Sequence, residues 1–556
     1  MEPAKSIDDK YKIVGNRFGI LTLSGETIFI LISVVLAFLL RLFLIPEEPT
    51  FNADSVHFLA LAKNVVHGDL AGAIHAYWPP LYPFLTGVTS VFFKDFEFAG
   101  RFVSVVAGTL LLVPVYYLIR DMYGRVPAYY GTVIVLIHPW LIVSSGWALT
   151  ESLYTLIFTT VVFTGWKALK SGNAVTYFIT GLLLGAAYLT KPEALGFLTL
   201  FLIFTIAAKF RRQNLTFRLM GARFLLVVFG LAIFLLPYVV VIHQKTGRWT
   251  FSEKMIGNTS LAEYEQDNFE LVGDGQTTRQ DQLVGTNRGE YHQVNNSSPQ
   301  VAELWTERRF DFVKFVSTTS LNIKKEVKEY LPSLFAYPLF LLAIIGVFYK
   351  PWTESRAAKE LYLLSFLIAT LVGYALAVVE ERYLYSIIPL LTCWISNGIV
   401  SFSDWASISI FNFPRSKQKV NPVIIQVFTF LISVVIWIVP PVIQNKFHAF
   451  PKIPEKQAGL WIKTHKTSSS LIMAPNPIVA YYAEEESIFL PNEEFSNVLQ
   501  YAIRKNVKYL VINSKNLGRT PKIVIPDNDD LPPNLKLVYR YDQDLSYEIL
   551  VYQLLD

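Results

Sequence analysis

The sequence predicts an α-helical protein that crosses a membrane many times and carries a small α/β domain at its C-terminal end. Of its 556 residues, 52% are hydrophobic and 17% are charged, and the mean hydropathy is +0.37. This composition is too apolar for a soluble chain of this length. Apolar runs long enough to cross a bilayer recur up to residue 441, and the composition beyond Pro440 and Pro441 is that of a soluble domain.

About eleven runs have the length, roughly 17 to 25 residues, that a bilayer-spanning helix needs. The first follows a polar segment, residues 1–26, and is long enough to be an anchor that stays in the protein rather than a cleaved signal peptide. Together the spans define a transmembrane domain over residues 27–441. The predicted spans are 27–45, 99–119, 127–144, 152–169, 174–190, 194–208, 224–243, 332–349, 361–379, 383–402 and 422–441.

Lysine and arginine predict the direction of these spans, because short cytoplasmic loops are rich in both residues. With a cytoplasmic N-terminus, the short outer segments hold only Lys63, Lys94, Lys191 and Arg382. The C-terminal end then lies outside the cytoplasm. The basic residues of the inner segments are Lys5, Lys10, Lys12, Arg17, Arg120, Arg125, Lys167, Lys170, Lys209, Arg211, Arg212, Arg218, Arg223, Lys350, Arg356, Lys359, Arg415, Lys417 and Lys419.

Two predicted outer loops are long, 46–98 and 244–331. The first contains a predicted surface helix, Asp54–His67, whose apolar residues recur every three to four positions, so that one side can lie on the membrane. An aromatic, proline-rich stretch, Tyr77–Pro83, follows it. The second loop is polar over residues 263–299, which predicts a segment that is mobile or ordered by substrate.

Residues 442–556 are predicted to form a small extracytoplasmic α/β domain. The expected order is a helix at 455–465, a strand at 471–474, a helix at 495–506, a strand at 509–513 and a closing pair of strands at 535–541 and 547–554. The only cysteine, Cys393, excludes an intrachain disulfide. The sequence has no phosphate-binding glycine loop, metal-finger spacing or basic stripe, so nucleic acid is not an expected partner.

Five acidic residues fall at the outer ends of predicted spans. Asp54 follows the first span, Glu151 begins the fourth, Glu193 begins the sixth, and Glu380 and Glu381 precede the tenth. Charged side chains at the rim of a bilayer are costly, so their concentration on one face predicts a functional site.

Three of these acids also have a purely structural interpretation. Asp54 can cap the surface helix, because aspartate is a favoured N-cap residue. Glu151 lies in a first helical turn, where the helix dipole favours an acid. Glu193 follows Pro192 at a predicted helix start, which is an ordinary place for both residues.

The neighbouring cations and aromatic residues allow the same two interpretations. Arg382 can be an interface anchor, although its position opposes the distribution of the other basic residues. His57 lies one turn after Asp54 and can pair with it or simply be solvated. Trp78 and Tyr82 fit the belt of aromatic residues found at membrane interfaces.

Five motifs occur in order along the chain: Asn52-Ala-Asp54, Trp78-Pro-Pro-Leu-Tyr-Pro83, Ala99-Gly-Arg-Phe102, Tyr188-Leu-Thr-Lys-Pro-Glu193 and Glu381-Arg-Tyr-Leu-Tyr-Ser-Ile-Ile-Pro389. Together they resemble the polyprenyl-phosphate-dependent glycosyltransferases of the GT-C type. Within that class the chain is most similar to protein O-mannosyltransferases and lipid A aminoarabinose transferases, which are glycosyltransferase family 39 and its relatives. The resemblance extends to the C-terminal domain, where 458–462 and 507–512 are similar to bacterial members.

This resemblance implies a transferase of the cell envelope, in the plasma (inner) membrane. Its expected partners are a polyprenyl-phosphate sugar, such as an undecaprenyl-phosphate derivative, and a lipid, glycan or protein acceptor. Asp54 matches the catalytic base of the family and Glu151 resembles its second acid. A carboxylate is a sufficient base, because a hydroxyl becomes strongly acidic only as its bond to the anomeric carbon forms. A single in-line displacement would invert that carbon.

The leaving phosphate needs positive charge, for which Arg382 and Lys191 are the best-placed cations. This chain has Pro79 and Pro80 where some relatives have a lysine before the proline, so the resemblance does not say how the phosphate is held. No cofactor is required, although Asp54 and Glu151 could bind a divalent metal. The other residues predicted at the site are His57 and His75 for the phosphate, and Glu193, Glu381, Trp78 and Tyr82 for substrate.

Two other functions are open to a chain of this kind. A transporter or lipid flippase would favour ionisable residues near the bilayer midplane and two related halves with broken helices. The acids of this chain lie at the rim of the spans, and no internal repeat is visible. A non-catalytic subunit that binds polyprenyl lipid would use Asp54 only as a helix cap.

Overall fold

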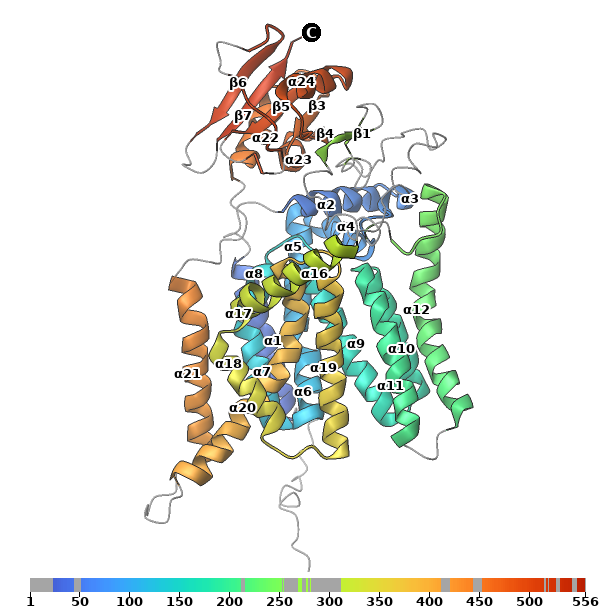
Figure 1. Ribbon diagram of the computed structural model, residues 1–556, viewed down its shortest axis with the longest axis vertical. Coiled ribbons are helices and arrows are strands. Elements are labelled where there is room, and N and C mark those ends of the chain that lie inside the picture. The colour runs from blue at the N-terminus through green and yellow to red at the C-terminus, as the bar shows by residue number, and fades with distance from the viewer. Residues whose placement is uncertain are drawn as a thin grey trace, which may run out of the picture.

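The computed structural model describes residues 24–44, 52–211, 216–252, 254, 269–272, 277–278, 281, 312–411, 421–443, 453–514, 517–518, 520–526, 531–542 and 548–555. They form a bundle of long, roughly parallel helices with an α/β domain beyond one end (Figure 1). Most of the polar stretch 263–299 lies outside the described residues. So do Lys5, Lys10, Lys12, Arg17, Arg212, Arg415, Lys417 and Lys419.

Each predicted span coincides with an apolar helix. Among the described residues, six helices are long and apolar enough to cross a membrane, and two bent helix pairs also meet that test. The remaining three predicted spans are shorter apolar helices. The helices of the bundle are α1 (Gly25–Leu44), α5 (Phe96–Leu110), α6 (Leu112–Tyr123), α7 (Arg125–Ile137), α8 (Pro139–Ser145), α9 (Glu151–Ser171), α10 (Ala174–Tyr188), α11 (Phe197–Arg211), α12 (Phe217–Thr246), α18 (Tyr337–Phe348), α19 (Glu354–Ala375), α20 (Ile388–Ala406) and α21 (Pro422–Ile443).

One bent pair, α7 and α8, has a clear cause. The two helices meet at 51° beside Pro139, which has no N–H to donate to the carbonyl of Val135. The guanidinium of Arg41 in α1 donates to this carbonyl (3.4 Å) and to that of Leu136 (3.5 Å). A buried cation therefore supplies the donors that the backbone lacks at the break.

Helices α18 and α20 approach each other closely at two glycines. A Cβ atom on Gly398 would lie 1.8 Å from the carbonyl oxygen of Leu342, and one on Gly346 would lie 2.1 Å from that of Trp394. Small residues at such crossings let membrane helices pack backbone to backbone. The crossing joins α20, which directly follows residues of the site described below, to the rest of the bundle.

The C-terminal domain contains one five-stranded sheet with the order β4-β3-β5-β7-β6. Strand β3 is parallel to β4 and β5, and β7 is antiparallel to β5 and β6. The predicted strands and helices are present, whereas α23 and β4 were not predicted. Helix α23 has only six residues, and β4 begins with Glu486 and Ser487 and so lacks the continuous apolar run of β3. The elements are α22 (Ile453–His465), β3 (Leu471–Ala474), α23 (Ile478–Ala483), β4 (Glu486–Phe489), α24 (Phe495–Arg504), β5 (Val507–Asn513), β6 (Leu535–Tyr541) and β7 (Ile549–Leu554).

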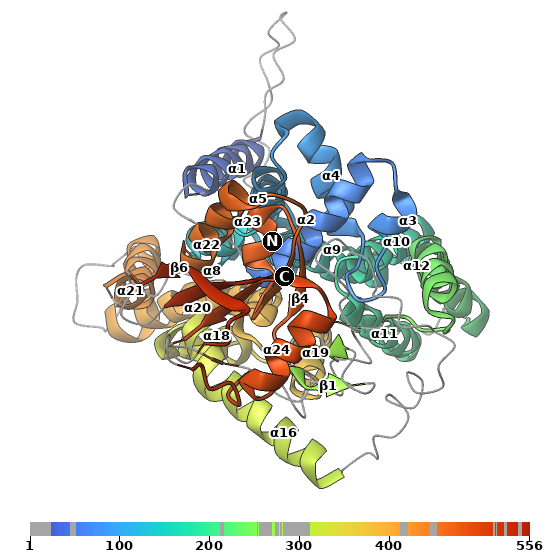
Figure 2. The same cartoon turned by 90° about the horizontal axis from the view of Figure 1, so that it is seen from above.

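A layer of short helices lies between the bundle and the C-terminal domain. It contains α2 (Ala53–Val66), α3 (Leu70–Ala73) and α4 (Leu81–Phe93). Viewed from above, the C-terminal domain covers the middle of the bundle, and α16 (Phe312–Lys325) extends outward at its edge (Figure 2). The predicted surface helix is confirmed as α2, but its residues 55–62 are all buried, so it does not leave one side free for the membrane.

We expect Gly398→Ala to destabilise the protein by about 1–3 kcal/mol, because the two helices must separate to make room for the new methyl group. The thermal unfolding midpoint of the detergent-solubilised protein measures this loss. Gly373→Ala in α19 is the matched control, since a Cβ atom there has nothing within 4 Å. Equal midpoints for the two variants would contradict the close crossing.

Candidate active site

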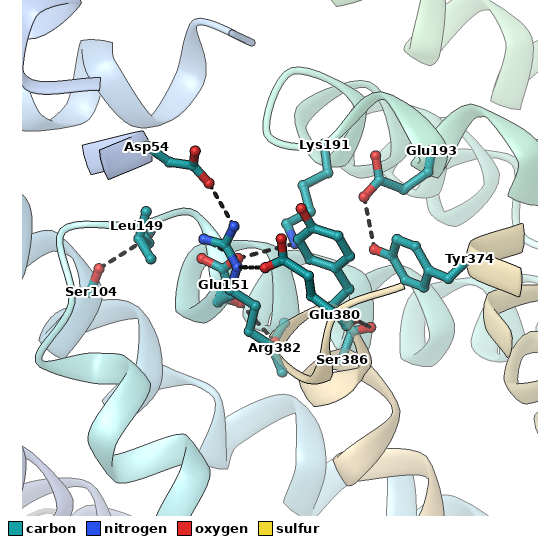
Figure 3. Close-up of polar contacts among 12 residues, drawn as sticks. Asp54, Ser104, Leu149, Glu151, Lys191, Glu193, Tyr374, Glu380, Arg382 and Ser386 are labelled. Carbon is teal, nitrogen blue, oxygen red and sulfur yellow. Dashed lines mark hydrogen bonds and ion pairs between the residues drawn. The ribbon is translucent and has the colours of Figure 1, made fainter. Parts of the chain in front are cut away.

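The first residue of the site is Asp54, in the first turn of α2. The side chain of Asn52 caps this helix by accepting from the N–H of Asp54 at 2.9 Å. Because Asn52 fills the capping role, the carboxylate of Asp54 is available for other contacts. Its Oδ2 accepts from Nη2 of Arg382 at 2.6 Å (Figure 3). The side chain of Asp54 is 32% exposed, so it forms the open side of the cluster.

Arg382 lies at the centre of the charged cluster. It belongs to the short helix η6 (Glu381–Ile387), which leads into α20. Its Nε donates to Oε2 of Glu380 at 2.6 Å, and its Nη1 lies 3.9 Å from Oε1 of Glu151. One guanidinium therefore joins three carboxylates, from α2, from the start of α9 and from its own loop (Figure 3).

Lys191 adds a second buried cation beside Glu151. Its Nζ lies 3.4 Å from Oε1 of Glu151, and both side chains are only 3% exposed. The ammonium group also faces the rings of Tyr383 (4.7 Å to the centroid) and Tyr154 (5.5 Å). Glu151 is the first residue of α9, where the helix dipole stabilises an acid. Its carboxylate also faces both Lys191 and Arg382.

A third cation, Lys254, was missed by the sequence analysis. It comes from the second long loop, and its Nζ lies 5.8 Å from the ring of Tyr383 and 6.0 Å from that of Trp78. A single lysine in a long polar loop gives no sequence pattern that would single it out. The ring of Tyr383 is thus approached by Lys191, Lys254 and Arg382.

The charge state of Asp54 follows from these neighbours. Burial by itself would raise the pKa of this carboxyl, but the charge and hydrogen bond of Arg382 outweigh it. The charge of Lys254 acts in the same direction. The pKa of Asp54 is therefore held below its usual range, and the carboxylate stays ionised at neutral pH.

The two histidines predicted to bind phosphate have local partners. The ring of His57 stacks on Trp78 with centroids 5.0 Å apart, and burial lowers the pKa of His57 to about 4, so the ring is neutral at neutral pH. Nδ1 of His75 accepts from the backbone N–H groups of Tyr77 (3.1 Å) and Trp78 (3.3 Å). Both rings shape the aromatic turn, and their predicted role at the phosphate remains a prediction.

The other predicted residues differ in how close they come to the cluster. Glu193 accepts from the hydroxyl of Tyr374 at 2.8 Å and lies beside Lys191 (Figure 3). Glu381 accepts from the hydroxyl of Ser333 in α17 (Leu331–Leu334). Tyr82 is fully buried and donates to the carbonyl of Gly100 at 2.7 Å, which makes it part of the packing between α4 and α5.

The acids of the cluster are paired with cations. Among the described residues, there is no group of three or more His, Cys, Asp or Glu side chains that could hold a metal ion. Asp54 and Glu151 both face Arg382, so a guanidinium lies between the two carboxylates that would share a metal.

The loop that contains Lys254 is tied to the C-terminal domain farther along the chain. Asp281 is buried and accepts from the N–H of Phe489 at 3.1 Å and from the hydroxyl of Thr278 at 2.7 Å. The carbonyl of Phe269 accepts from the N–H of Asn492 at 2.8 Å. Burial raises the pKa of Asp281 to about 7.

The bundle and the adjoining α/β domain have the fold of the GT-C glycosyltransferases. A family model for dolichyl-phosphate-mannose-protein mannosyltransferases matches residues 78–243, which include Glu151 and Lys191. The resemblance found in the sequence motifs is thereby confirmed at the level of fold. No curated protein matches the chain in sequence.

Two solved structures are similar in fold to most of the chain. The oligosaccharyltransferase AglB from Archaeoglobus fulgidus, in complex with an inhibitory peptide and a dolichol-phosphate, matches with a TM-score of 0.57 and 14% identity over 87% of this chain and 69% of that one. ArnT from Cupriavidus metallidurans, bound to undecaprenyl phosphate, matches with a TM-score of 0.53 and 12% identity over 95% of this chain and 97% of that one.

The contact made by Asp281 should depend on pH. Its pKa in the folded protein lies above the ordinary value, so docking of the loop favours the protonated carboxyl. The contact is then strongest at acidic pH and weakens as pH rises through about 7. Hydrogen exchange at the Phe489 amide should be faster at pH 8 than at pH 6, after correction for the intrinsic effect of pH. Asp281→Asn should abolish the difference, and an unchanged difference in that variant would refute the assignment.

Proposed function

We propose that the protein is a membrane glycosyltransferase that moves a sugar from a polyprenyl-phosphate sugar to an acceptor hydroxyl, with Asp54 as the base. The observation that carries the proposal is the partly open carboxylate of Asp54, kept ionised by Arg382 at 2.6 Å within a cluster of cations. The similarity of the fold to proteins solved with dolichol-phosphate and undecaprenyl phosphate supports the choice of donor.

The reaction is a single in-line displacement at the anomeric carbon. The acceptor oxygen forms a bond to that carbon while the bond from the carbon to the phosphate oxygen breaks, so the configuration inverts. The acceptor proton passes to Asp54, and the electron pair leaves with the polyprenyl phosphate. Asp54 needs little basicity, because the proton becomes acidic only as the new bond forms.

Three cations can receive the charge that develops on the leaving phosphate. Arg382 offers a planar pair of donors, while Lys191 and Lys254 offer point charges near the ring of Tyr383. Some relatives have a lysine where this chain has Pro79, and Lys254 thus supplies a cation in its place. We propose that Glu151 orients Lys191 and Arg382. Substrate binding is proposed for Trp78, Glu193 and Glu381.

We propose that these side chains act without a resident metal. The guanidinium between Asp54 and Glu151 already supplies the positive charge that a metal would bring to the phosphate. A divalent ion held by the same two carboxylates is the alternative, and it would have to displace Arg382 from them.

The membrane topology is part of the proposal. The six long helices, the two bent pairs and the three shorter helices that match predicted spans together support eleven crossings. The basic residues of the short loops support a cytoplasmic N-terminus, an extracytoplasmic site and an extracytoplasmic C-terminal domain in the plasma (inner) membrane.

Reporter fusions test this orientation. A fusion after Arg218 should report a cytoplasmic position and one after Leu555 an extracytoplasmic position, because the basic loops stay inside. The ratio of alkaline phosphatase to β-galactosidase activity distinguishes the two sides. The opposite pattern at either point would overturn the proposed location of the site.

Asp54→Asn should abolish sugar transfer in membranes supplied with donor, with a loss of about a hundredfold or more, since removal of a general base typically costs 10²–10⁴ in rate. Asp69→Asn is the matched control: it changes an acid of the same loop that caps α3 through the N–H of Gly72. Mass spectrometry of product and of accumulated lipid-linked sugar measures both variants and identifies the donor.

The outcome also separates the rival functions. Normal transfer by Asp54→Asn would refute the proposed base. Binding of donor by the unmodified protein without any product would favour a lipid-binding subunit, and movement of donor across the bilayer without sugar transfer would favour a flippase.

Lys254→Ala should raise the KM for donor by about tenfold or more, since a hydrogen bond to a charged group contributes about 1.5–3 kcal/mol. Lys254→Arg should restore most of the affinity. Lys324→Ala, on the exposed side of α16, is the control for general loss of positive charge. A donor KM that does not differ between Lys254→Ala and the control would exclude Lys254 from the phosphate site.

A further inference from the structure

Helix α2, which carries Asp54, is held on two opposite faces. One face packs into the core of the bundle through Phe58 and Leu61. The other face presents Val56 and Leu59, which are fully buried in a separate small cluster with Ile478 of α23 and Ala148. Since α23 belongs to the C-terminal domain, that domain packs against this side of α2 together with Ala148 of the bundle.

Charged and aromatic contacts also attach α23 to α2 and to α5. Lys63, two turns after Val56, places its ammonium over the rings of Tyr481 (5.0 Å) and Phe96 (5.8 Å). The hydroxyl of Tyr482 donates to Oε2 of Glu97 in α5 at 3.3 Å. Glu97 is itself fixed by the buried Arg101 at 2.6 Å. The short helix α23 is therefore attached to α2 and to the bundle beside it.

The same edge of the C-terminal domain also holds the second long loop. Strand β4 follows α23 directly, and the N–H of Phe489 at its end donates to Asp281 of that loop. Helix α2, which carries the proposed base, and the loop that contains Lys254 thus both contact the part of the C-terminal domain formed by α23 and β4.

We propose that the C-terminal domain is part of the catalytic apparatus, with Ile478 as a positioning residue that acts on Asp54 through Val56 and Leu59. The inference rests on the proposed function. A helix of 14 residues moves as a unit, and Val56 is only two residues from Asp54. Loss of the contact would let α2 shift relative to Arg382, and displacements of about 1 Å at a reacting group can lower rates by up to a hundredfold.

The test compares Ile478→Ala with Ile512→Ala in the full-length protein. Ile512 is an equally buried isoleucine of the same domain, and it lies on the opposite face of the sheet, in the cluster formed with α24. Both variants lose the same atoms from a packed core, so general destabilisation affects both. Only Ile478→Ala should increase hydrogen exchange in residues 54–66. Unchanged exchange in α2 would overturn the inference, and this result does not depend on any activity.

The kinetic test uses the same pair of variants. Ile478→Ala should lower kcat about tenfold with an unchanged donor KM, and the acid limb of its pH profile should move to higher pH because Arg382 holds Asp54 less firmly. Ile478→Val should restore most of kcat, whereas Ile512→Ala should keep the kcat and pH profile of the unmodified protein. Equal profiles for Ile478→Ala and Ile512→Ala would refute the positioning role. Absence of transfer by the unmodified protein would refute the proposed function instead, and the exchange test would still decide the inference.

Discussion

The contact between Asp54 and Arg382 is the interaction on which the rest of the site depends. It joins residues 328 positions apart and brings α2 to the helix η6 that leads into α20. Arg382 is 10% exposed, and a guanidinium so far removed from water is costly unless carboxylates compensate it. Asp54, Glu151 and Glu380 provide that compensation, so the buried guanidinium is stable only where these carboxylates meet it.

The sequence predicted the features that depend on local composition. Hydropathy located an apolar helix or bent helix pair for each predicted span, because burial in a bilayer imposes a length and an apolar character on a helix. Strand β3 was predicted at its observed bounds, 471–474. The family motifs and the charges at the outer ends of predicted spans led to Asp54, Glu151, Lys191 and Arg382, and these four residues do lie in one cluster. Charges at the membrane rim are costly, so charges of opposite sign from several segments neutralise one another.

Features that depend on tertiary contacts could not be predicted in this way. Aspartate and asparagine cap helices about equally well, so sequence alone could not show that Asn52 rather than Asp54 caps α2. Lys254 is defined as a site residue only by the path of a long loop. The sequence could not separate an interfacial Tyr82 from the buried Tyr82 that bonds to Gly100, because tyrosine suits both environments.

The arrangement also links donor binding to the strength of the base. In the protein alone, Arg382 divides its donors among three carboxylates, and its hold on Asp54 keeps that carboxylate a weak base. In the proposed reaction, a donor phosphate held by Arg382, Lys191 and Lys254 would add negative charge and compete for the same guanidinium. Both effects favour the protonated form of a nearby carboxyl, so the pKa of Asp54 rises when donor is present. As the proposed base, Asp54 would thus gain basicity only when a sugar is in place to be transferred, and the proposed positioning by Ile478 through α2 would keep it within reach of that change.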